Sequence, residues 1–370
     1  MTLRCVLIGY GRMGQLHAKK WRALGVDVVG VVDPRAGERA AADGLPVVGS
    51  VAEAFGAAPD LWDVCVPTAA HATVLGTVCA LDRDADLIVE KPLCAPADVS
   101  RVRGVLAGHR GRVVVGENYH SSHVATAVAR AAARLGLTVR QVVVEMSKHR
   151  GADVRAGRFE DESLGALGYE GPHLLAVLAD FGAAAGTGVW PAGEAEVAFH
   201  GEQDAEDGPP RYGVDIRYTT AQGLDVALAT SVAGRISHPL GPHAPRRRPL
   251  PVEDRTTRHR VLGVLGTDPR GDAWELVGTF EPVAALPRGT ATVAVRRAAA
   301  DAVTGTAAGA WRPVRTLADD SLARHLARTV AHFTGGGDNP APPDRALEHL
   351  ALLHGWSRPR SSLLLQGTTP

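Results

Sequence analysis

The chain has 370 residues, too many for one ordinary hydrophobic core, and this length predicts two domains. Basic and acidic side chains number 40 each, which argues against a nucleic-acid or membrane-surface role, because both usually need a basic excess. No apolar run is long enough to span a membrane, and the chain enters a strand at once instead of a secretion signal, so we expect a cytoplasmic protein.

The first part of the chain alternates strand and helix. Residues 4–9 form a continuous apolar run, typical of a strand buried on both faces of a parallel sheet. A helix is predicted over 13–24, and further strands over 26–33, 61–68, 85–93 and 111–118. This alternation predicts an α/β fold that begins with a doubly wound sheet, a Rossmann dinucleotide-binding domain over residues 1–122.

After Asn118 the pattern changes. A helix over 123–136 and a strand over 138–146 precede a glycine-punctuated helix that ends near Phe181. Strands then follow one another directly, at 194–201, 211–220, 224–232, 258–266, 272–280 and 290–298. Such a run predicts a second α/β domain over 123–320, with a largely antiparallel open sheet for substrate binding and oligomerisation. Two amphipathic helices close the chain, at 322–336 and 343–358.

Two connections have unusual compositions. Residues 201–210 are acidic and turn-rich, and residues 237–255 are proline-rich and carry Arg246, Arg247 and Arg248. We interpret both as solvated hairpin connections. The alternative is that the three arginines bind an anionic substrate or a neighbouring subunit.

A glycine motif follows the first strand and opens the first helix. Gly9, Gly11 and Gly14 have the G-x-G-x-x-G spacing of a dinucleotide site. The first glycine permits a tight turn, the second lets the pyrophosphate approach, and the third lets helix and strand pack closely. The helix N-terminus then offers its N–H groups to the phosphates.

An acidic residue, Asp33, ends the second strand. A carboxylate there would accept hydrogen bonds from the ribose hydroxyls and repel a 2′-phosphate, which favours NAD and makes NADP the less favoured cofactor. Arg35, close by, weakens that preference.

Lysine occurs only four times, at Lys19, Lys20, Lys91 and Lys148. Lys91 stands between Glu90 and Pro92, where the proline keeps the strand extended up to its carboxyl end. That end is where ligands bind in open α/β sheets. A partly desolvated lysine beside Glu90 can exchange a proton near neutral pH or donate to a developing alkoxide.

These motifs, in this order, resemble the Gfo/Idh/MocA oxidoreductase family, which includes glucose-fructose oxidoreductase and inositol dehydrogenases. The resemblance spans nearly the whole chain, through VLIGYGRMGQLHAKKW, VCVPTAAHATV, VEKPL, SLGALGYEGPHLLAVLADFG and PPDRALEHLALLHGWSR. It implies a site in the cleft between two domains, with residues 321–370 folded back onto the nucleotide domain. It also implies that Lys91 contacts the reacting oxygen and is catalytic.

The glycine-rich helix departs from the family pattern. Alignment on Gly171 and His173 puts Tyr169 where the family has an aspartate. The resemblance implies that His173 is the acid/base that exchanges a proton with the substrate; the alternative is a buried structural histidine. A tyrosine, with a pKa of about 10, cannot balance an imidazolium, although Glu170 could, and Pro172 would start or kink a helical turn. We expect Tyr169 to face the cleft as a neutral donor to the substrate.

The remaining candidates follow from their places near strand ends and in the family motifs. The predicted cofactor contacts are Gly9, Gly11, Arg12, Met13, Gly14, Asp33, Arg35, Pro67, Thr68, His71, Glu90 and Lys91. The predicted substrate contacts are Lys91, Asn118, Tyr119, Tyr169, Glu170 and His173, of which Lys91, His173 and Tyr169 are catalytic. His17 and His71 have the alternative of satisfying backbone groups. No metal is expected, because neither the histidines nor Cys5, Cys65, Cys79 and Cys94 have a metal-binding spacing.

The sequence therefore predicts an NAD(H)-dependent oxidoreductase that interconverts a secondary alcohol and a ketone on a sugar, cyclitol or related biosynthetic intermediate. The alternatives are an imine reductase or NAD-dependent glycosidase of the same family, or a non-catalytic dinucleotide-binding sensor. The expected partner is a small polyol or keto-sugar, with no nucleic acid and no membrane. Because a bare apolar sheet face is rare in water, we also expect a homodimer or homotetramer built on residues within about 190–300.

Overall fold

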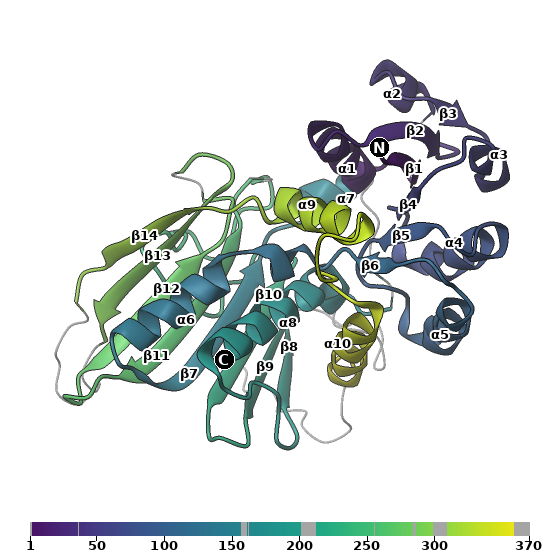
Figure 1. The fold of residues 1–370 in the computed structure, drawn as a ribbon. Coiled ribbons are helices and arrows are strands. Elements are labelled where there is room, and N and C mark those ends of the chain that lie inside the picture. The colour runs from purple at the N-terminus through teal and green to yellow at the C-terminus, as the bar shows by residue number, and fades with distance from the viewer. Residues whose placement is uncertain are drawn as a thin grey trace, which may run out of the picture.

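The structure is a computed structural model that describes residues 2–35, 37–156, 161, 163–200, 212–254, 256–283, 286–298 and 309–358. Its strands form two separate sheets, one from the N-terminal third and one from the rest of the chain (Figure 1). The acidic connection at 201–210 lies outside the described residues.

The first sheet has six parallel strands in the order β3-β2-β1-β4-β5-β6. The strands are β1 Arg4–Ile8, β2 Asp27–Val32, β3 Val47–Val48, β4 Leu61–Val64, β5 Asp86–Val89 and β6 Val113–Val115. The connecting helices are α1 Arg12–Ala23, α2 Gly37–Ala42, α3 Val51–Phe55, α4 Thr68–Leu81, η1 Pro96–Asp98 and α5 Val99–Ala107. The predicted doubly wound sheet is confirmed. The strand order reverses between β1 and β4, and a ligand crevice opens beyond the carboxyl ends of the strands at such a point.

The second sheet has eight strands in the order β14-β13-β12-β11-β7-β10-β9-β8. Neighbouring strands of this sheet are antiparallel, as predicted, except for the parallel pair β7 and β10. The strands are β7 Thr138–Ser147, β8 Glu196–His200, β9 Gly213–Thr219, β10 Asp225–Ser231, β11 His259–Thr267, β12 Ala273–Thr279, β13 Thr290–Arg297 and β14 Arg312–Ala318. Helices α6 Val124–Arg134 and α8 Ala166–Ala185 pack against this sheet (Figure 1), and the short α7 Gly151–Arg155 follows β7.

The segment between β10 and β11 is not a hairpin connection, which corrects our interpretation of residues 237–255. Strands β10 and β11 lie on opposite sides of β7, so the segment must cross that strand. It packs on the sheet as it crosses: Leu250 is buried, and a Cβ added at Gly263 of β11 would lie 2.5 Å from Leu240. Part of the sheet is therefore covered within the chain, and the expected oligomer stays a prediction.

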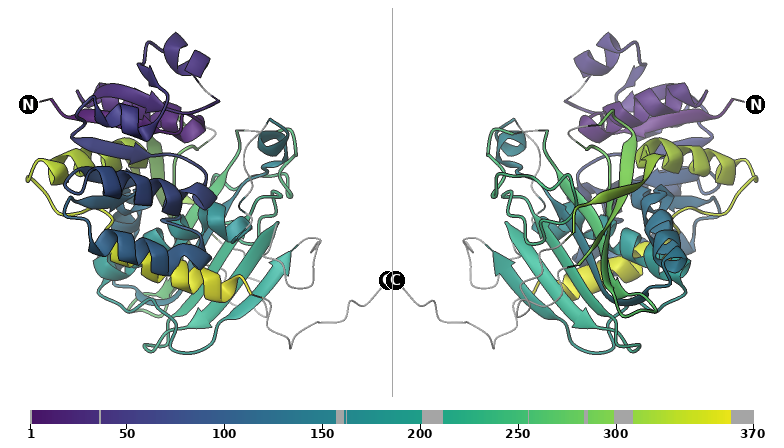
Figure 2. Two further views of the ribbon diagram at one scale, coloured as in Figure 1. Left: turned by 90° about the vertical axis from the view of Figure 1, so that its right-hand side faces the viewer. Right: turned by 90° about the vertical axis from the view of Figure 1, so that its left-hand side faces the viewer.

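The last two helices return to the first sheet. Figure 2 shows both of them, in yellow tones, beside the purple and blue N-terminal elements. Helix α9 Ser321–Phe333 contacts η2 Asn118–Ser121, and α10 Pro343–Trp356 packs against α8 and β6. Between them, the amide of Val115 in β6 donates to the carbonyl oxygen of Ala341 over 2.9 Å. Among the helices described, none combines the length and apolar character that a bilayer-spanning segment requires.

Candidate active site

The glycine turn between β1 and α1 has the geometry of a dinucleotide cradle. Gly9 adopts φ +95°, and a Cβ there would lie 2.8 Å from the backbone of Cys65. A Cβ at Gly14 would lie 2.1 Å from the carbonyl oxygen of Gly9, so helix and turn can be this close only with glycine. At Gly11, in contrast, a Cβ would meet no described atom within 4 Å. The open space above Gly11 is where a pyrophosphate would approach, and the residues therefore fit a dinucleotide.

The start of α1 strengthens that fit. No side chain caps its N-terminus, and its first turn holds no acidic residue, so its N–H groups and its positive dipole end are available to phosphates. Arg12 and Met13 form this turn, with Arg12 exposed. Arg12 also faces the second domain, because its Nη1 lies 3.6 Å from Oδ1 of Asp153 in α7.

Asp33 lies just beyond the carboxyl end of β2. Its two carboxylate oxygens accept backbone N–H groups, from Tyr10 at 2.7 Å and from Arg35 at 2.8 Å. These bonds fix the carboxylate beside the glycine turn, where further lone pairs can accept from a ribose. The side chain of Arg35 is exposed.

Lys91 extends from the end of β5 toward α8. Its Nζ donates a hydrogen bond to the carbonyl oxygen of Tyr169, which brings the two predicted catalytic segments together. Glu90, its neighbour, faces the interior of the first sheet, where His17 Nε2 lies 3.2 Å from Oε1 of Glu90 and His17 Nδ1 lies 2.8 Å from Oδ2 of Asp63. Burial alone would lower the pKa of His17, but the carboxylate of Asp63 raises it well above its usual value. Glu90 thus contacts a buried histidine of α1 beside the strand end that presents Lys91, and its contact with the cofactor stays a prediction.

Helix α8 is continuous through Pro172 and carries the other predicted site residues. His173 is buried, and its ring centroid lies 4.7 Å from that of Tyr119. Burial, followed by the positive charge of Lys91, lowers the pKa of His173 well below its usual value. The imidazole is therefore neutral at neutral pH and can accept a proton. Its Nδ1 is buried without a hydrogen-bond partner among the described residues.

Glu170 binds arginines rather than orienting His173. It forms an ion pair with Arg150, and its Oε2 lies 3.3 Å from Nη2 of Arg260. Although burial would raise the pKa of Glu170, these guanidinium groups lower it well below the usual range. The ring of Tyr169 stacks on Arg150, with 4.8 Å between the guanidinium carbon and the ring centroid.

Three basic residues of this region, Arg150, Arg258 and Arg260, were absent from our predicted site. In the pairing of β7 with β11, Ser147 lies opposite His259, so the segments KHR at 148–150 and RHR at 258–260 meet at one edge of the sheet. Side chains alternate along a strand, which explains why alternate members of both segments face the same side. The repeated basic-His-basic pattern beside two strands was the signal available in the sequence.

Other predicted residues contact protein groups outside the Lys91–Tyr169 pair. Asn118 donates to Ser321 Oγ over 2.7 Å, so its amide is held by α9. His71 is buried, with Nδ1 2.9 Å from the carbonyl oxygen of Pro92 and Nε2 2.9 Å from that of Val66, which matches the alternative of satisfying backbone groups. Pro67 precedes α4, and Thr68 Oγ1 lies 3.5 Å from Asp161. Tyr119, in contrast, stays near His173 and accepts from Arg260 Nη1 over 2.8 Å.

A second buried polar cluster lies behind the site and ties three elements together. Glu117 Oε2 lies 3.0 Å from His349 Nδ1 and 3.3 Å from His120 Nε2, and His120 Nδ1 lies 2.9 Å from Asp180. Burial would raise the pKa of Glu117, but hydrogen bonds from the two histidines lower it to about 2. This cluster holds α10 and α8 to the end of β6.

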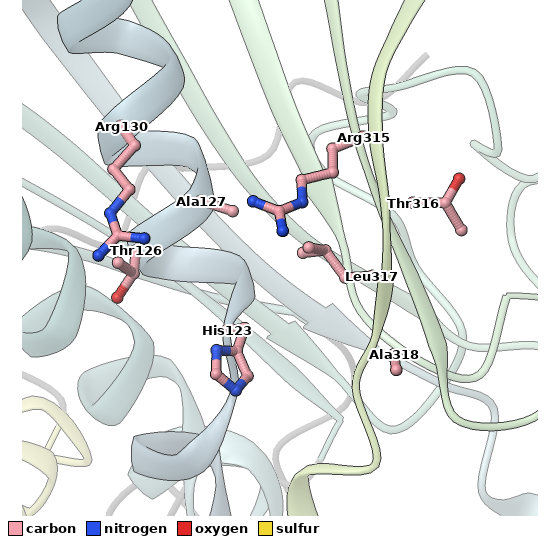
Figure 3. Close-up of a pocket in the computed structure, with 8 residues that line it drawn as sticks. All are labelled: His123, Thr126, Ala127, Arg130, Arg315, Thr316, Leu317 and Ala318. Atoms are coloured by element: carbon pink, nitrogen blue, oxygen red, sulfur yellow. The ribbon is translucent and has the colours of Figure 1, made fainter.

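One cavity of the second domain lies away from this site. It measures about 390 Å³ and lies between α6 and β14, with Arg130, Arg315 and His123 on its wall (Figure 3). Its lining includes none of the predicted cofactor, substrate or catalytic residues. The candidate active site is therefore defined by the convergence of the glycine turn, Lys91 and α8.

Comparison with known proteins agrees with this geometry. Residues 3–117 match the family model GFO_IDH_MocA, described as an oxidoreductase family with an NAD-binding Rossmann fold. No curated protein matches the chain.

Solved structures match over nearly the whole chain. UDP-N-acetylglucosamine 3-dehydrogenase GnnA from Acidithiobacillus ferrooxidans is 16% identical, with 96% of this chain and 97% of that chain covered and a TM-score of 0.64. GenD2 from gentamicin A biosynthesis, solved in complex with NAD, is 20% identical, with 95% and 92% covered and a TM-score of 0.64. A protein from Desulfitobacterium hafniense DCB-2, assigned as an NADPH-dependent oxidoreductase, is 14% identical, with 96% and 94% covered and a TM-score of 0.68. The chain thus shares the fold of these proteins, and its residues 3–117 match the Rossmann domain of the Gfo/Idh/MocA oxidoreductase family.

Proposed function

We propose that the chain is an NAD(H)-dependent dehydrogenase that interconverts a secondary alcohol and a ketone on a sugar, cyclitol or related biosynthetic intermediate. The observation that carries this proposal is the meeting of Lys91, at the carboxyl end of β5, with the segment of α8 that holds Tyr169 and His173. The names of GnnA, a sugar-nucleotide dehydrogenase, and of GenD2, solved with NAD, support the reaction class and the cofactor.

The choice of NAD over NADP rests on Asp33. Its carboxylate is held beside the glycine turn by the amides of Tyr10 and Arg35. A 2′-phosphate at that position would meet a negative charge, while a ribose hydroxyl would find an acceptor.

The proton chemistry would belong to Lys91 and His173. In the direction of alcohol oxidation, the Lys91 ammonium donates a hydrogen bond to the substrate oxygen and stabilises the developing alkoxide. The neutral imidazole of His173 takes the hydroxyl proton, which its lowered pKa permits at neutral pH. When bound, NAD supplies the acceptor for the hydride that leaves the carbinol carbon. Ketone reduction uses the same groups in reverse.

The carbonyl oxygen of Tyr169 would orient the lysine. A hydrogen bond to a backbone oxygen of a buried helix limits the rotamers of a long side chain, so that Nζ is held at the reacting oxygen. The aromatic ring of Tyr119, packed on His173, would limit the imidazole in the same way.

A turnover assay tests the proposal. Purified protein with NAD would be incubated with a panel of polyols, cyclitols and sugar nucleotides, and NADH formation followed by absorbance. We expect oxidation of at least one member that carries a secondary hydroxyl. Binding of NADH without turnover on any member, in either direction, would instead indicate a dinucleotide-binding sensor.

A further inference from the structure

Arg258 differs from Lys148, Arg150 and Arg260 because no carboxylate among the described residues forms an ion pair with it. Lys148 is paired with Asp153, and Arg150 and Arg260 share Glu170. Among the described residues, no acidic side chain forms a salt bridge with Arg258, whose guanidinium makes one long hydrogen bond, 3.4 Å to the carbonyl oxygen of Thr256. Arg258 is only partly exposed.

The surroundings of Arg258 are strongly positive. Burial, followed by the charge of Arg260, lowers the pKa of Arg258 to about 10, although the carboxylate of Glu170 acts in the opposite direction. Burial also lowers the pKa of Lys148 to about 8, against the hydrogen bond to Asp153, and the charge of Arg258 contributes to this lowering. A guanidinium that is partly removed from water and surrounded by like charges is costly unless an anion compensates it. The anion that acts on Arg258 among the described residues is Glu170, which is already paired with Arg150 and Arg260.

Arg258 also lines a cavity of about 340 Å³ between the start of β11 and the segment that connects β10 to β11. Arg246 and Arg247, the arginines that stood out in the sequence, lie on the wall of the same cavity. The one acidic side chain on that wall, Asp254, accepts hydrogen bonds from Thr256 and Thr257, so it is already engaged. The cavity is thus basic, and Arg258 on its wall is two residues from Arg260 of the candidate site.

We propose that the substrate of this site carries an anionic group, a carboxylate or a phosphate, and that Arg258 is its principal partner. This inference rests on the proposed function, and it narrows the substrate from a neutral polyol to a charged sugar derivative. A planar guanidinium fork matches both groups, because each presents two oxygens to two parallel N–H donors. Arg246 and Arg247 lie where a second charge, farther from the reacting carbon, would bind.

The separate donors for the cofactor phosphates argue against the cofactor as the anion of Arg258. The cofactor phosphates have their own donors at the N-terminus of α1 and at Gly11. Arg258 comes from the other domain and adjoins Arg260, which contacts Tyr119 beside His173. This is the side of the cleft where the proposed substrate oxygen lies.

The test compares charged and uncharged probes on the NADH-saturated protein by isothermal titration calorimetry. The probes are glucose, glucuronate, inorganic pyrophosphate and UDP-glucose. We expect at least one anionic probe to bind more tightly than glucose, and Arg258→Gln to weaken that probe by roughly tenfold to a hundredfold, the worth of hydrogen bonds to a charged group. Arg103→Gln, at an exposed arginine of α5, is the matched control and should change nothing.

Two further sets of variants distinguish the possible sources of the negative charge and control for misfolding. Arg258→Lys keeps the positive charge but lacks the two parallel N–H donors of the guanidinium, so it should lose less affinity for the anionic probe than Arg258→Gln does. If the anion is a distal pyrophosphate, the double variant Arg246→Gln/Arg247→Gln should bind UDP-glucose more weakly and glucuronate with unchanged affinity. If the anion is a carboxylate near the reacting carbon, the double variant should bind both probes with unchanged affinity.

The inference is overturned if no anionic probe binds more tightly than glucose, or if Arg258→Gln leaves every affinity unchanged. It is also overturned if Arg258→Gln lowers the affinity for NADH by the same factor, because Arg258 would then bind the cofactor. If the protein oxidises a neutral polyol and Arg258→Gln does not change that turnover, the charged substrate is refuted and the dehydrogenase function stands. If an anionic probe binds through Arg258 but no probe is turned over, the dehydrogenase function is refuted and the charged ligand stands.

Discussion

Lys91 and Tyr169 are joined by a hydrogen bond from the lysine ammonium to the backbone carbonyl oxygen of the tyrosine. This bond links the end of β5 in one sheet to a helix that packs on the other. The family pattern has a carboxylate where Tyr169 stands, yet the contact with the lysine here is made by the main chain. A substitution at position 169 that preserves the helix should therefore preserve the position of Lys91.

Removal of the lysine should abolish most of the catalysis. We expect Lys91→Ala to lower kcat by a factor on the order of 10²–10⁴, because the ammonium that stabilises the developing alkoxide is lost. The dissociation constant of NADH, measured by fluorescence titration, should change little. Turnover at the wild-type rate would show that Lys91 has only a structural role.

His173 and Tyr169 should each contribute less to kcat than Lys91 does. We expect His173→Ala to reduce kcat clearly less than Lys91→Ala, and Tyr169→Phe to act mainly on KM, because the backbone carbonyl that holds Lys91 remains. Steady-state kinetics of the three variants gives the ranking. Equal losses for His173→Ala and Lys91→Ala would show that no other group can replace His173 as the acceptor of the hydroxyl proton.

Glu170 should matter for stability more than for the pH profile. Glu170→Gln leaves Arg150 and Arg260 without their buried counter-ion, a loss that costs about 3–5 kcal/mol in comparable pairs. We expect a lower midpoint of urea unfolding and, at temperatures where the variant is folded, only a small shift of the pH dependence of kcat to lower pH, because the carboxylate of Glu170 is one of several charges that act on the pKa of His173. A large shift would show that Glu170 is the principal support of the imidazolium.

Asp33 should control the cofactor preference. The wild type should bind NADH more tightly than NADPH, and Asp33→Ser should narrow or invert that preference. Loss of a charged acceptor and of the repulsion at the 2′ position should change the ratio of the two dissociation constants by roughly tenfold to a hundredfold. A wild-type preference for NADPH would contradict our interpretation of Asp33 and Arg35.

Buried histidines should make the fold sensitive to acid. His325 in α9 is fully buried, with Nε2 2.9 Å from the carbonyl oxygen of Val115, and burial lowers its pKa to about 3. The unfolded chain, with an ordinary histidine pKa near 6.5, then binds more protons, so stability is complete above that pH and is lost as the pH falls toward 3. We expect the unfolding free energy to fall below pH 6.5 and His325→Gln to reduce the slope by up to about 1.4 kcal/mol per pH unit. Equal slopes would contradict this.

The sequence was most informative where one local rule decides the structure. The glycine turn, Asp33 and Lys91 lie at strand ends, and parallel strands bring their carboxyl ends to one edge of a sheet, so these positions could be predicted from strand patterns alone. Strand β14 was missed because it is largely exposed and contains Pro313, so it lacks the alternation that marks a half-buried strand.

Contacts between distant segments could not be predicted in the same way. The pairing of Glu170 with Arg150 and Arg260 depends on the register between β7 and β11 and on the packing of α8 above them. No spacing within one segment encodes that register. Asn118 illustrates the same limit, because its neighbour in space, Ser321, lies 203 positions away.

The pairing of β6 with the segment before α10 has a consequence for synthesis of the chain. Strand β6 is the outer strand of the first sheet, and its open side is completed by Asn339, which donates to the carbonyl oxygen of Val113 over 2.8 Å, and by Ala341. Asn339 follows Val113 by 226 positions. Strand β6 is therefore synthesised, with its outer edge unpaired, long before the segment with Asn339 and Ala341. Unpaired strand edges can pair with other chains. We expect nascent chains that stop before residue 339 to depend on chaperones and to aggregate without them.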